Sequence, residues 1–173
     1  MPKGLKETSS LIEVSFQVNE SAPNTFTEER IDLQLNPLDN EVFVVYAIDM
    51  DPFPPEAIAG VDTRTFSSLT STLQGALNGV ANLGVSNCLA TAQDSIQAAG
   101  FVDGGVPFTT RAGNTPPTTL GYIGIIATND FFVQVQGVGN TGARGVSGRM
   151  YGVRARADAS IYAALVQSEV LSS

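Results

Sequence analysis

The chain has 173 residues, of which 43% are hydrophobic and 15% charged, and its formal net charge is −8 at pH 7. This length and composition fit a single globular domain with a sizeable core and exclude a disordered chain. The negative charge disfavours a general affinity for nucleic acid or for anionic membranes.

The first third of the chain alternates apolar and polar residues as β-strands do. Residues 11–18 place four apolar side chains on one face, namely Ile12, Val14, Phe16 and Val18. Residues 25–35 continue in extended form, and residues 36–40, Asn-Pro-Leu-Asp-Asn, predict a turn. Residues 41–49 are nearly all apolar, which predicts a central strand covered on both faces and ended by the proline-rich residues 51–55.

The middle of the chain gives weaker signals. Residues 63–72 are rich in Ser and Thr and predict a strand, whereas residues 73–83 carry two glycines and predict a loop. Residues 86–99 fit both the helical and the strand period, and we favour a strand because the neighbouring segments are strands. Residues 100–117 are punctuated by glycine and proline and predict mostly loop.

The last third holds the strongest β pattern. Residues 120–128 and 131–136 flank Asn129-Asp130, which predicts a two-residue hairpin. Residues 137–142 are glycine-rich and predict a second hairpin turn, because they lack the Gly-Lys-Ser/Thr ending of a phosphate-binding loop.

A strand and a helix are expected to close the chain. Residues 145–157 predict a long strand, and Asp158 follows it as the N-cap of a helix that extends through Val170. This helix would bury a short apolar stripe made of Ile161, Leu165 and Val166.

About eight strand candidates without regularly interleaved helices predict an all-β fold. An antiparallel two-sheet sandwich is the natural packing, either a jelly roll or an immunoglobulin-like Greek key. The chain has no Trp and only one Cys, so the immunoglobulin signature is missing and a jelly roll with a short C-terminal helix is favoured. We expect an N-terminal arm at 1–10, a β-sandwich domain at 11–157 and a C-terminal helix and tail at 158–173.

Few side chains suited to catalysis are present. The chain has no His, and Cys88 is its single cysteine, so a zinc site or a nucleophilic triad is not expected. We therefore expect no cofactor and no enzymatic activity. Residues 1–8 lack the apolar region of a signal peptide, and residues 42–48, the longest apolar run, are too short for a transmembrane segment.

The acidic residues offer two further hypotheses. Asp49 and Asp51 are spaced so that both carboxylates could ligate Ca²⁺, although a solvated acidic turn explains the pair more simply. Asp49 with Asp62 or Asp103 would be needed for a carboxylate-only glycosidase, and nothing in the sequence brings these residues together.

The basic residues concentrate late in the chain, at Arg144, Arg149, Arg154 and Arg156. On a strand, Arg154 and Arg156 share one face and Arg149 takes the other. These arginines either contact phosphates or form ion pairs within the chain or across a subunit contact. We favour ion pairs, with acids such as Glu28, Glu29 or Asp32.

Three segments carry a resemblance to a known family. Residues 122–136 (YIGIIATNDFFVQVQ), residues 149–169 and the DMDPFPP sequence at 49–55 resemble jelly-roll capsid proteins of uncultured marine viruses. The resemblance covers about half of the chain and implies a capsid subunit of a virion, which assembles with other copies of itself and with other virion proteins. The chain lacks the long basic arm of many small RNA-virus capsid proteins, since Lys3 and Lys6 are its only N-terminal lysines. This departure implies weak or no direct binding to the genome.

The leading functional hypothesis is thus a self-assembling capsid protein without catalytic activity, and the low charge fraction suits a surface covered by neighbours. One alternative is a carbohydrate- or ligand-binding module that uses Phe53, Tyr122 or Tyr151 as an aromatic platform. A viral decoration, fibre or tail component is a second alternative.

Overall fold

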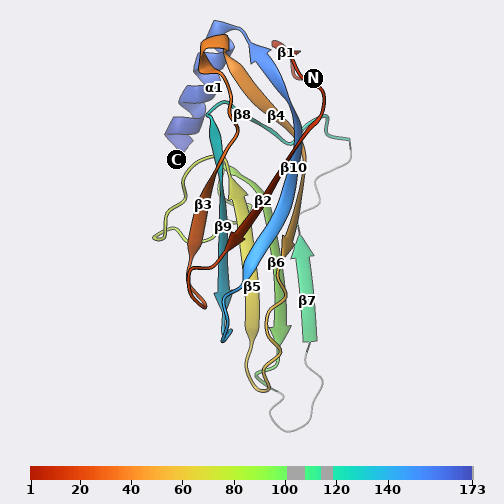
Figure 1. Ribbon diagram of the computed structural model, residues 1–173, viewed down its shortest axis with the longest axis vertical. Coiled ribbons are helices and arrows are strands. Elements are labelled where there is room, and N and C mark those ends of the chain that lie inside the picture. Colours follow the sequence, from red (N-terminus) through yellow and green to blue (C-terminus); the bar gives the residue numbers. More distant parts are fainter. Residues whose placement is uncertain (101–107, 114–118, 173) are drawn as a thin grey trace.

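A computed structural model describes residues 1–100, 108–113 and 119–172 of the chain. These residues form two antiparallel five-stranded sheets and a C-terminal helix, which confirms the predicted two-sheet sandwich (Figure 1). No helix in this described part of the chain is long and apolar enough to cross a membrane.

The first sheet, sheet A, is built around its longest strand. It contains β1 (Leu5–Glu7), β2 (Ile12–Asn19), β4 (Glu41–Pro52), β8 (Gly124–Ile126) and β10 (Gly145–Ala157). Strand β10 pairs with β4 on one side, and on its other side it pairs with β2 over one half and with β1 over the other. Strand β8 pairs with the far edge of β4.

The second sheet, sheet B, has the strand order β3-β9-β5-β6-β7. Its strands are β3 (Thr27–Asp32), β5 (Thr63–Thr70), β6 (Cys88–Gln97), β7 (Phe108–Gly113) and β9 (Asp130–Val138). A single 3-10 turn, η1 (Pro37–Asp39), occupies the turn predicted at 36–40. Strand β7 was not expected, because it lies within the predicted loop at 100–117; residues 101–107 and 114–118 of that segment lie outside the described residues.

The strand order is that of a jelly roll. Omitting β1 and β7, the two sheets read β2-β10-β4-β8 and β3-β9-β5-β6, so the chain winds between the sheets as two Greek keys do. This winding makes both hairpin predictions wrong. Asn129-Asp130 leads from β8 in sheet A to β9 in sheet B, and the turn at 137–142 leads from β9 to β10, which also lie in different sheets.

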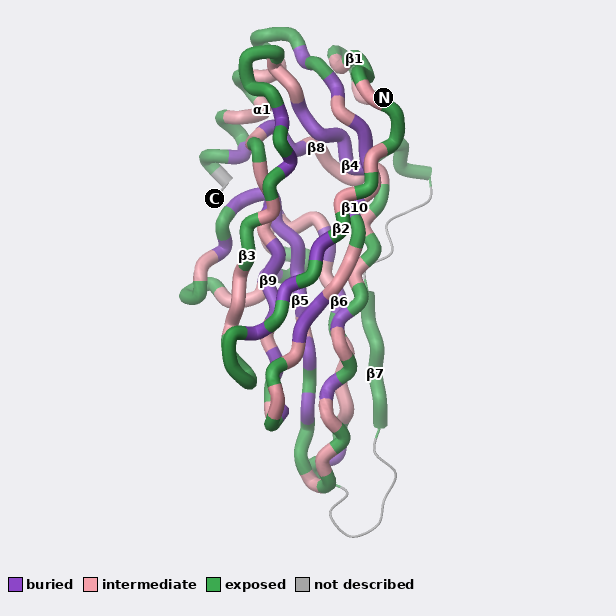
Figure 2. The backbone as a smooth tube through the Cα atoms, viewed as in Figure 1, coloured by how far each residue is buried: buried purple, intermediate pink, exposed green. Residues whose placement is uncertain are grey.

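The main core fills the space between the two sheets. Alternate residues of β2 and β10 point inward, as the pattern at 11–18 predicted, and the rings of Phe16 and Phe131 meet edge-to-face with their centroids 5.9 Å apart. Gly148 of β10 makes room for Phe16, since a Cβ at this position would lie 2.6 Å from the phenyl ring. Figure 2 shows that buried residues follow β4, β5, β9 and β10, whereas β7 is exposed throughout.

Helix α1 (Ala159–Ser172) covers part of the outer face of sheet A. Val42 and Val44 of β4 pack on this side against Leu165 and Val166, which confirms coverage on both faces for the first half of the strand predicted at 41–49. The prediction is wrong for the second half, where Ala47 and Asp49 are exposed. Tyr162, and not Ile161, is the third helical residue in this apolar cluster.

The predicted N-cap of this helix is also confirmed. The Asp158 carboxylate accepts hydrogen bonds of 2.9 Å from the backbone N–H of Ile161 and from the Ser160 hydroxyl, and these bonds hold the pKa of Asp158 below its ordinary value. Near the far end of α1, the Glu169 carboxylate accepts from the backbone N–H groups of Ala127 and Thr128. Asp158 thus caps the first turn of the helix, and Glu169 fixes its far end to the residues that follow β8.

Candidate functional site

The part of the outer face of sheet A that α1 leaves uncovered contains a polar groove of about 680 Å³. Strand register sets Asp49, Arg149 and Ser15 in one row across β4, β10 and β2, and it sets Asp51, Ser147 and Gln17 in the next. Tyr151 lies in the row on the other side of Arg149, opposite Ala47 and Glu13. The groove therefore combines hydrogen-bonding side chains with the ring of Tyr151.

A β-bulge in β4 brings the acids to this face. The register between β10 and β4 shifts between Tyr151 and Gly152, so that Tyr46 is an extra residue in β4. Before the bulge, the outer face carries the apolar Val42 and Val44; after it, the same face carries Asp49 and Asp51. The bulge thus divides one strand into a half that binds the helix and a half that faces solvent.

The groove contains both of the predicted calcium ligands, and two of its charged side chains form ion pairs. Asp51 forms an ion pair with Arg111 of β7, and Arg149 Nη1 lies 3.8 Å from Glu13 Oε2. Among the residues that the structure describes, no group of three or more His, Cys, Asp or Glu side chains is gathered for a metal ion. A calcium ion at Asp49 and Asp51 stays a prediction.

The structure separates Asp49 from Asp62. The Asp62 carboxylate accepts hydrogen bonds from the backbone N–H groups of Ala98 and Ala99, at 2.8 and 2.9 Å, and it lines a depression on sheet B. Asp103 lies outside the described residues. Asp49 and Asp62 therefore line separate depressions, and the structure does not bring them together as a glycosidase would need.

All four clustered arginines have acidic partners within the chain, and the partners differ from Glu28, Glu29 and Asp32. The ion pairs are Arg144–Glu56 at 3.4 Å, Arg149–Glu13 at 3.8 Å, Arg154–Glu41 at 3.4 Å and Arg156–Asp39 at 3.7 Å. The side chains of Arg149 and Arg156 are 57% and 58% exposed, so their pairs lie in solvent and contribute little to stability.

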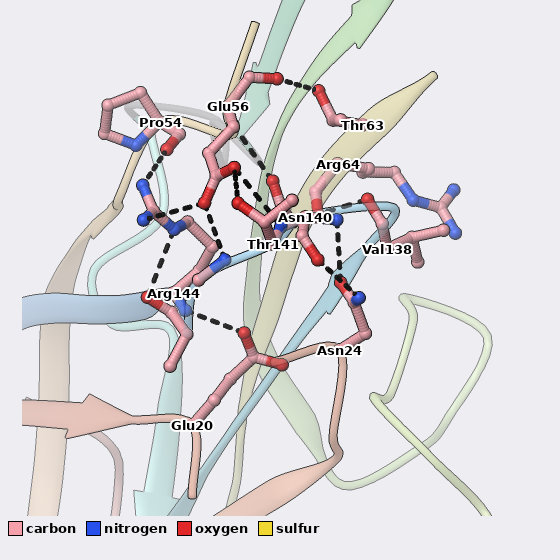
Figure 3. A network of polar contacts seen from close by, with 12 residues as sticks. Glu20, Asn24, Pro54, Glu56, Thr63, Arg64, Val138, Asn140, Thr141 and Arg144 are labelled. Atoms are coloured by element: carbon pink, nitrogen blue, oxygen red, sulfur yellow. Dashed lines mark hydrogen bonds and ion pairs between the residues drawn. The ribbon is translucent and has the colours of Figure 1, made fainter. Parts of the chain in front are cut away.

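Arg144 belongs to a network that joins three loops at one end of the sandwich (Figure 3). The Glu56 carboxylate accepts hydrogen bonds from the Thr141 hydroxyl and from the backbone N–H of Gly142 at 2.7 Å. These two bonds are the main reason why the pKa of Glu56 lies below its ordinary value. Glu56 thereby fixes the loop before β5 to the turn between β9 and β10.

Glu20 and Asn140 complete this network. Glu20 is buried and accepts from the backbone N–H groups of Thr25, Gly137 and Arg144 at 2.7–2.9 Å. The Asn140 side chain accepts from the Glu56 N–H and donates to the Arg64 carbonyl. Because these side chains are satisfied by neighbouring backbone groups, the network stabilises the loops. No local signal in the sequence predicts it, since its members come from distant turns.

A second buried network lies on the outer face of sheet B. Gln134 of β9 is 0% exposed; its carbonyl oxygen accepts from the Ser68 hydroxyl, and its amide donates to Thr70 and to Glu28. Glu28 also accepts from the backbone N–H groups of Gln74 and Gly75. The network thereby attaches residues 71–87, called here the 71–87 loop, to the sheet, and the prediction of a loop at 73–83 is confirmed.

The remaining candidates are dispersed. Of the three predicted platform aromatics, Tyr151 alone lines the groove; Phe53 packs beside Gly145, and Tyr122 precedes β8. Cys88 begins β6, and burial raises the pKa of its thiol.

A scan against protein-family models gave no match for this chain, and a search of the curated proteins found no similar sequence. The fold and the two faces of the sandwich therefore carry the functional argument.

Proposed function

We propose that this chain is a non-enzymatic structural protein that self-assembles as a capsid subunit of a virion. The observation that carries the proposal is the jelly-roll order of the eight central strands. Viral capsid proteins, lectins and cupins use this architecture. The jelly-roll architecture alone therefore does not distinguish a capsid protein from a lectin or a cupin.

Two properties of the chain favour the capsid class. A chain without His cannot build a metal site from imidazole, which disfavours a cupin-like metalloenzyme. The resemblance of residues 122–136 and 149–169 to marine viral capsid proteins points in the same direction, and these residues include most of β9, part of β10 and most of α1.

The proposed partners are other copies of this chain, with further virion proteins as additional contacts. Direct genome binding is expected to be weak, because the net charge is −8. Lys6 lies in β1, which pairs with β10 of the same chain, so this lysine is part of the folded sheet.

Light scattering and electron microscopy of the purified full-length protein test the proposal. We expect rings or closed particles of many copies, and assembly should increase with salt, which screens repulsion between acidic subunits. A chain that stays monomeric at all concentrations and salt conditions and is absent from any particle would contradict the proposal. The number of copies per native particle distinguishes a major capsid protein from a decoration, fibre or tail component.

The groove on sheet A favours a second candidate, a carbohydrate-binding module. Tyr151 provides an apolar ring beside Gln17, Asp49 and Arg149, and such a combination can bind a sugar through stacking and hydrogen bonds. A glycan array measures this activity. Binding that is lost in Tyr151→Ala and kept in Tyr122→Ala, which changes an aromatic residue outside the groove, would support this function over the structural one.

A further inference from the structure

The 71–87 loop presents apolar side chains to solvent. Leu73, Leu77 and Leu83 are 62%, 104% and 65% exposed. No residue between Arg64 and Asp94 is charged, although 15% of the chain is. Exposed apolar surface of this kind usually marks a contact with another molecule. Figure 1 shows the loop projecting sideways from the sandwich, in yellow-green.

The loop is held in place by hydrogen bonds to sheet B. Glu28 accepts from the backbone N–H groups of Gln74 and Gly75 at 2.8 and 3.1 Å, and the Ala81 N–H donates to the Ser68 hydroxyl at 3.0 Å. The Asn87 side chain donates to the Thr72 hydroxyl, and this hydrogen bond joins the two ends of the loop. A fixed loop loses little conformational entropy when a partner binds, so its leucines are preorganised for contact.

An apolar groove of about 530 Å³ lies beside this loop on the outer face of sheet B. Val80, Ala81 and Leu83 line one side, while strands β5, β6 and β7 contribute Phe66, Ala92 and Ala112. Arg64 is the only charged residue among the described residues of the lining, and its guanidinium lies 4.4 Å from the centroid of the Phe66 ring. Leu77 is not part of the lining, so the most exposed leucine and the groove are separate features of one molecule.

The charge of the chain indicates what occupies the groove. Two copies with a net charge of −8 each repel one another, and a contact between them is favoured where no carboxylates meet. Among the described residues, neither the loop nor the lining of the groove contains an acid. Leu77 belongs to the same loop as Val80, which lines the groove, so each copy presents a protruding side chain and an adjoining groove that a neighbouring copy can contact.

We propose that Leu77 of one copy inserts into the groove on sheet B of the next copy. The inference rests on the proposed function, because it names the contact through which subunits of the assembly meet. The proposed contact differs from a general adhesive surface because it pairs one side chain, Leu77, with the groove of another copy.

The first test is a charge substitution at the tip of the loop. Leu77→Asp places an acid in an apolar groove, and we expect self-association of the full chain, measured by sedimentation velocity, to weaken about 30-fold or more. Leu38→Asp is the matched control, since Leu38 is 92% exposed on η1, outside both loop and groove, and should leave association unchanged. Unchanged thermal unfolding would show that both variants are folded. An equal loss of self-association in both variants would contradict the proposed Leu77 contact.

Cross-linking tests whether Leu77 of one copy meets the groove of another. In a Cys88→Ala background, one variant carries Leu77→Cys and the other Gln93→Cys, an exposed position that lines the groove. Mild oxidation of the mixture should give disulfide-linked dimers faster than oxidation of either variant alone. Faster dimerisation of the Leu77→Cys variant alone would indicate a loop-to-loop contact instead and would overturn the inference.

Different experimental results would contradict the proposed Leu77 contact and the proposed capsid function. If the wild-type chain assembles and Leu77→Asp assembles equally well, the contact is wrong and the capsid function stands. If the wild-type chain is monomeric under every condition, both proposals fall.

Discussion

The outer faces of the two sheets are each partly covered, but by different interactions. On sheet A, α1 buries apolar side chains against Val42 and Val44. On sheet B, the 71–87 loop lies over a polar network in which Gln134 is fully buried. One cover depends on apolar area and the other on the directions of hydrogen bonds.

The difference has an energetic consequence. A buried amide costs free energy unless its donors and acceptors are paired, and Gln134 meets this condition through Ser68, Thr70 and Glu28. Removing one member leaves the others unsatisfied, whereas truncating an apolar side chain of α1 leaves no buried polar group without a partner. We therefore expect the loop side to be more sensitive to single substitutions than the helix side.

The largest effect is expected for Gln134→Ala. Removing this side chain leaves a cavity and deprives Ser68, Thr70 and Glu28 of a partner, which should lower the free energy of unfolding by about 3 kcal/mol. Urea unfolding followed by circular dichroism measures the change. Gln17→Ala, at an exposed position in the groove on sheet A, is the control and should change stability by less than about 0.5 kcal/mol.

An intermediate effect is expected for Leu165→Ala. Leu165 is half-buried against sheet A, so the loss in the free energy of unfolding should be about 1–2 kcal/mol. Leu171→Ala removes a leucine that is 76% exposed on the same helix and should be nearly neutral. A cost for Leu165→Ala as large as that for Gln134→Ala would remove the contrast between the two covers.

The smallest effect is expected for Asp158→Ala, which removes the N-cap of α1 and should lower the urea midpoint at neutral pH. Because folding lowers the pKa of Asp158, its carboxylate form stabilises the fold. The stabilisation is complete above the unfolded-state pKa and is lost as the pH falls through the lower pKa of the folded state. The difference in midpoint between wild type and variant should therefore shrink in acid, and a constant difference down to low pH would show that the charge of the cap plays no part.

The sequence predicted the features that depend on neighbouring residues. Strand β10 at Gly145–Ala157 and the alternating face of β2 follow from periodicity, and the covered half of β4 follows from its continuous apolar run. Asp158 was identified as a cap because capping involves residues a few positions apart. Each of these predictions depends only on residues close together in the sequence, so distant strand pairings do not change it.

Pairings between distant strands were harder to predict. The turns at 129–130 and 137–142 have the composition of hairpins, yet each connects different sheets, because composition does not encode which strand will be the neighbour. The acidic partners of Arg149 and Arg156 depend on the strand register, which the sequence does not reveal. The network around Gln134 joins β3, β5 and β9 and requires the same long-range information.

Strand β7 was missed for a different reason. All six of its residues are exposed at the edge of sheet B, so no alternation between buried and exposed positions marks it. The glycines and prolines around it predict a loop equally well. An edge strand that is exposed to solvent on both faces therefore has no distinctive hydrophobic pattern in the sequence.

The central place of β10 in sheet A sets the order in which the protein can be completed during its synthesis. Among the described residues, β1 and β2 pair with no strand except β10, which is translated more than a hundred residues after them. During synthesis, β1 and β2 therefore remain without a strand partner until β10 has been translated. The folding of sheet A thus depends on contacts between residues far apart in the sequence. A subunit finished in this order offers its folded surface to other copies only after residues 145–157 have emerged, which delays association until nearly all of the sandwich exists.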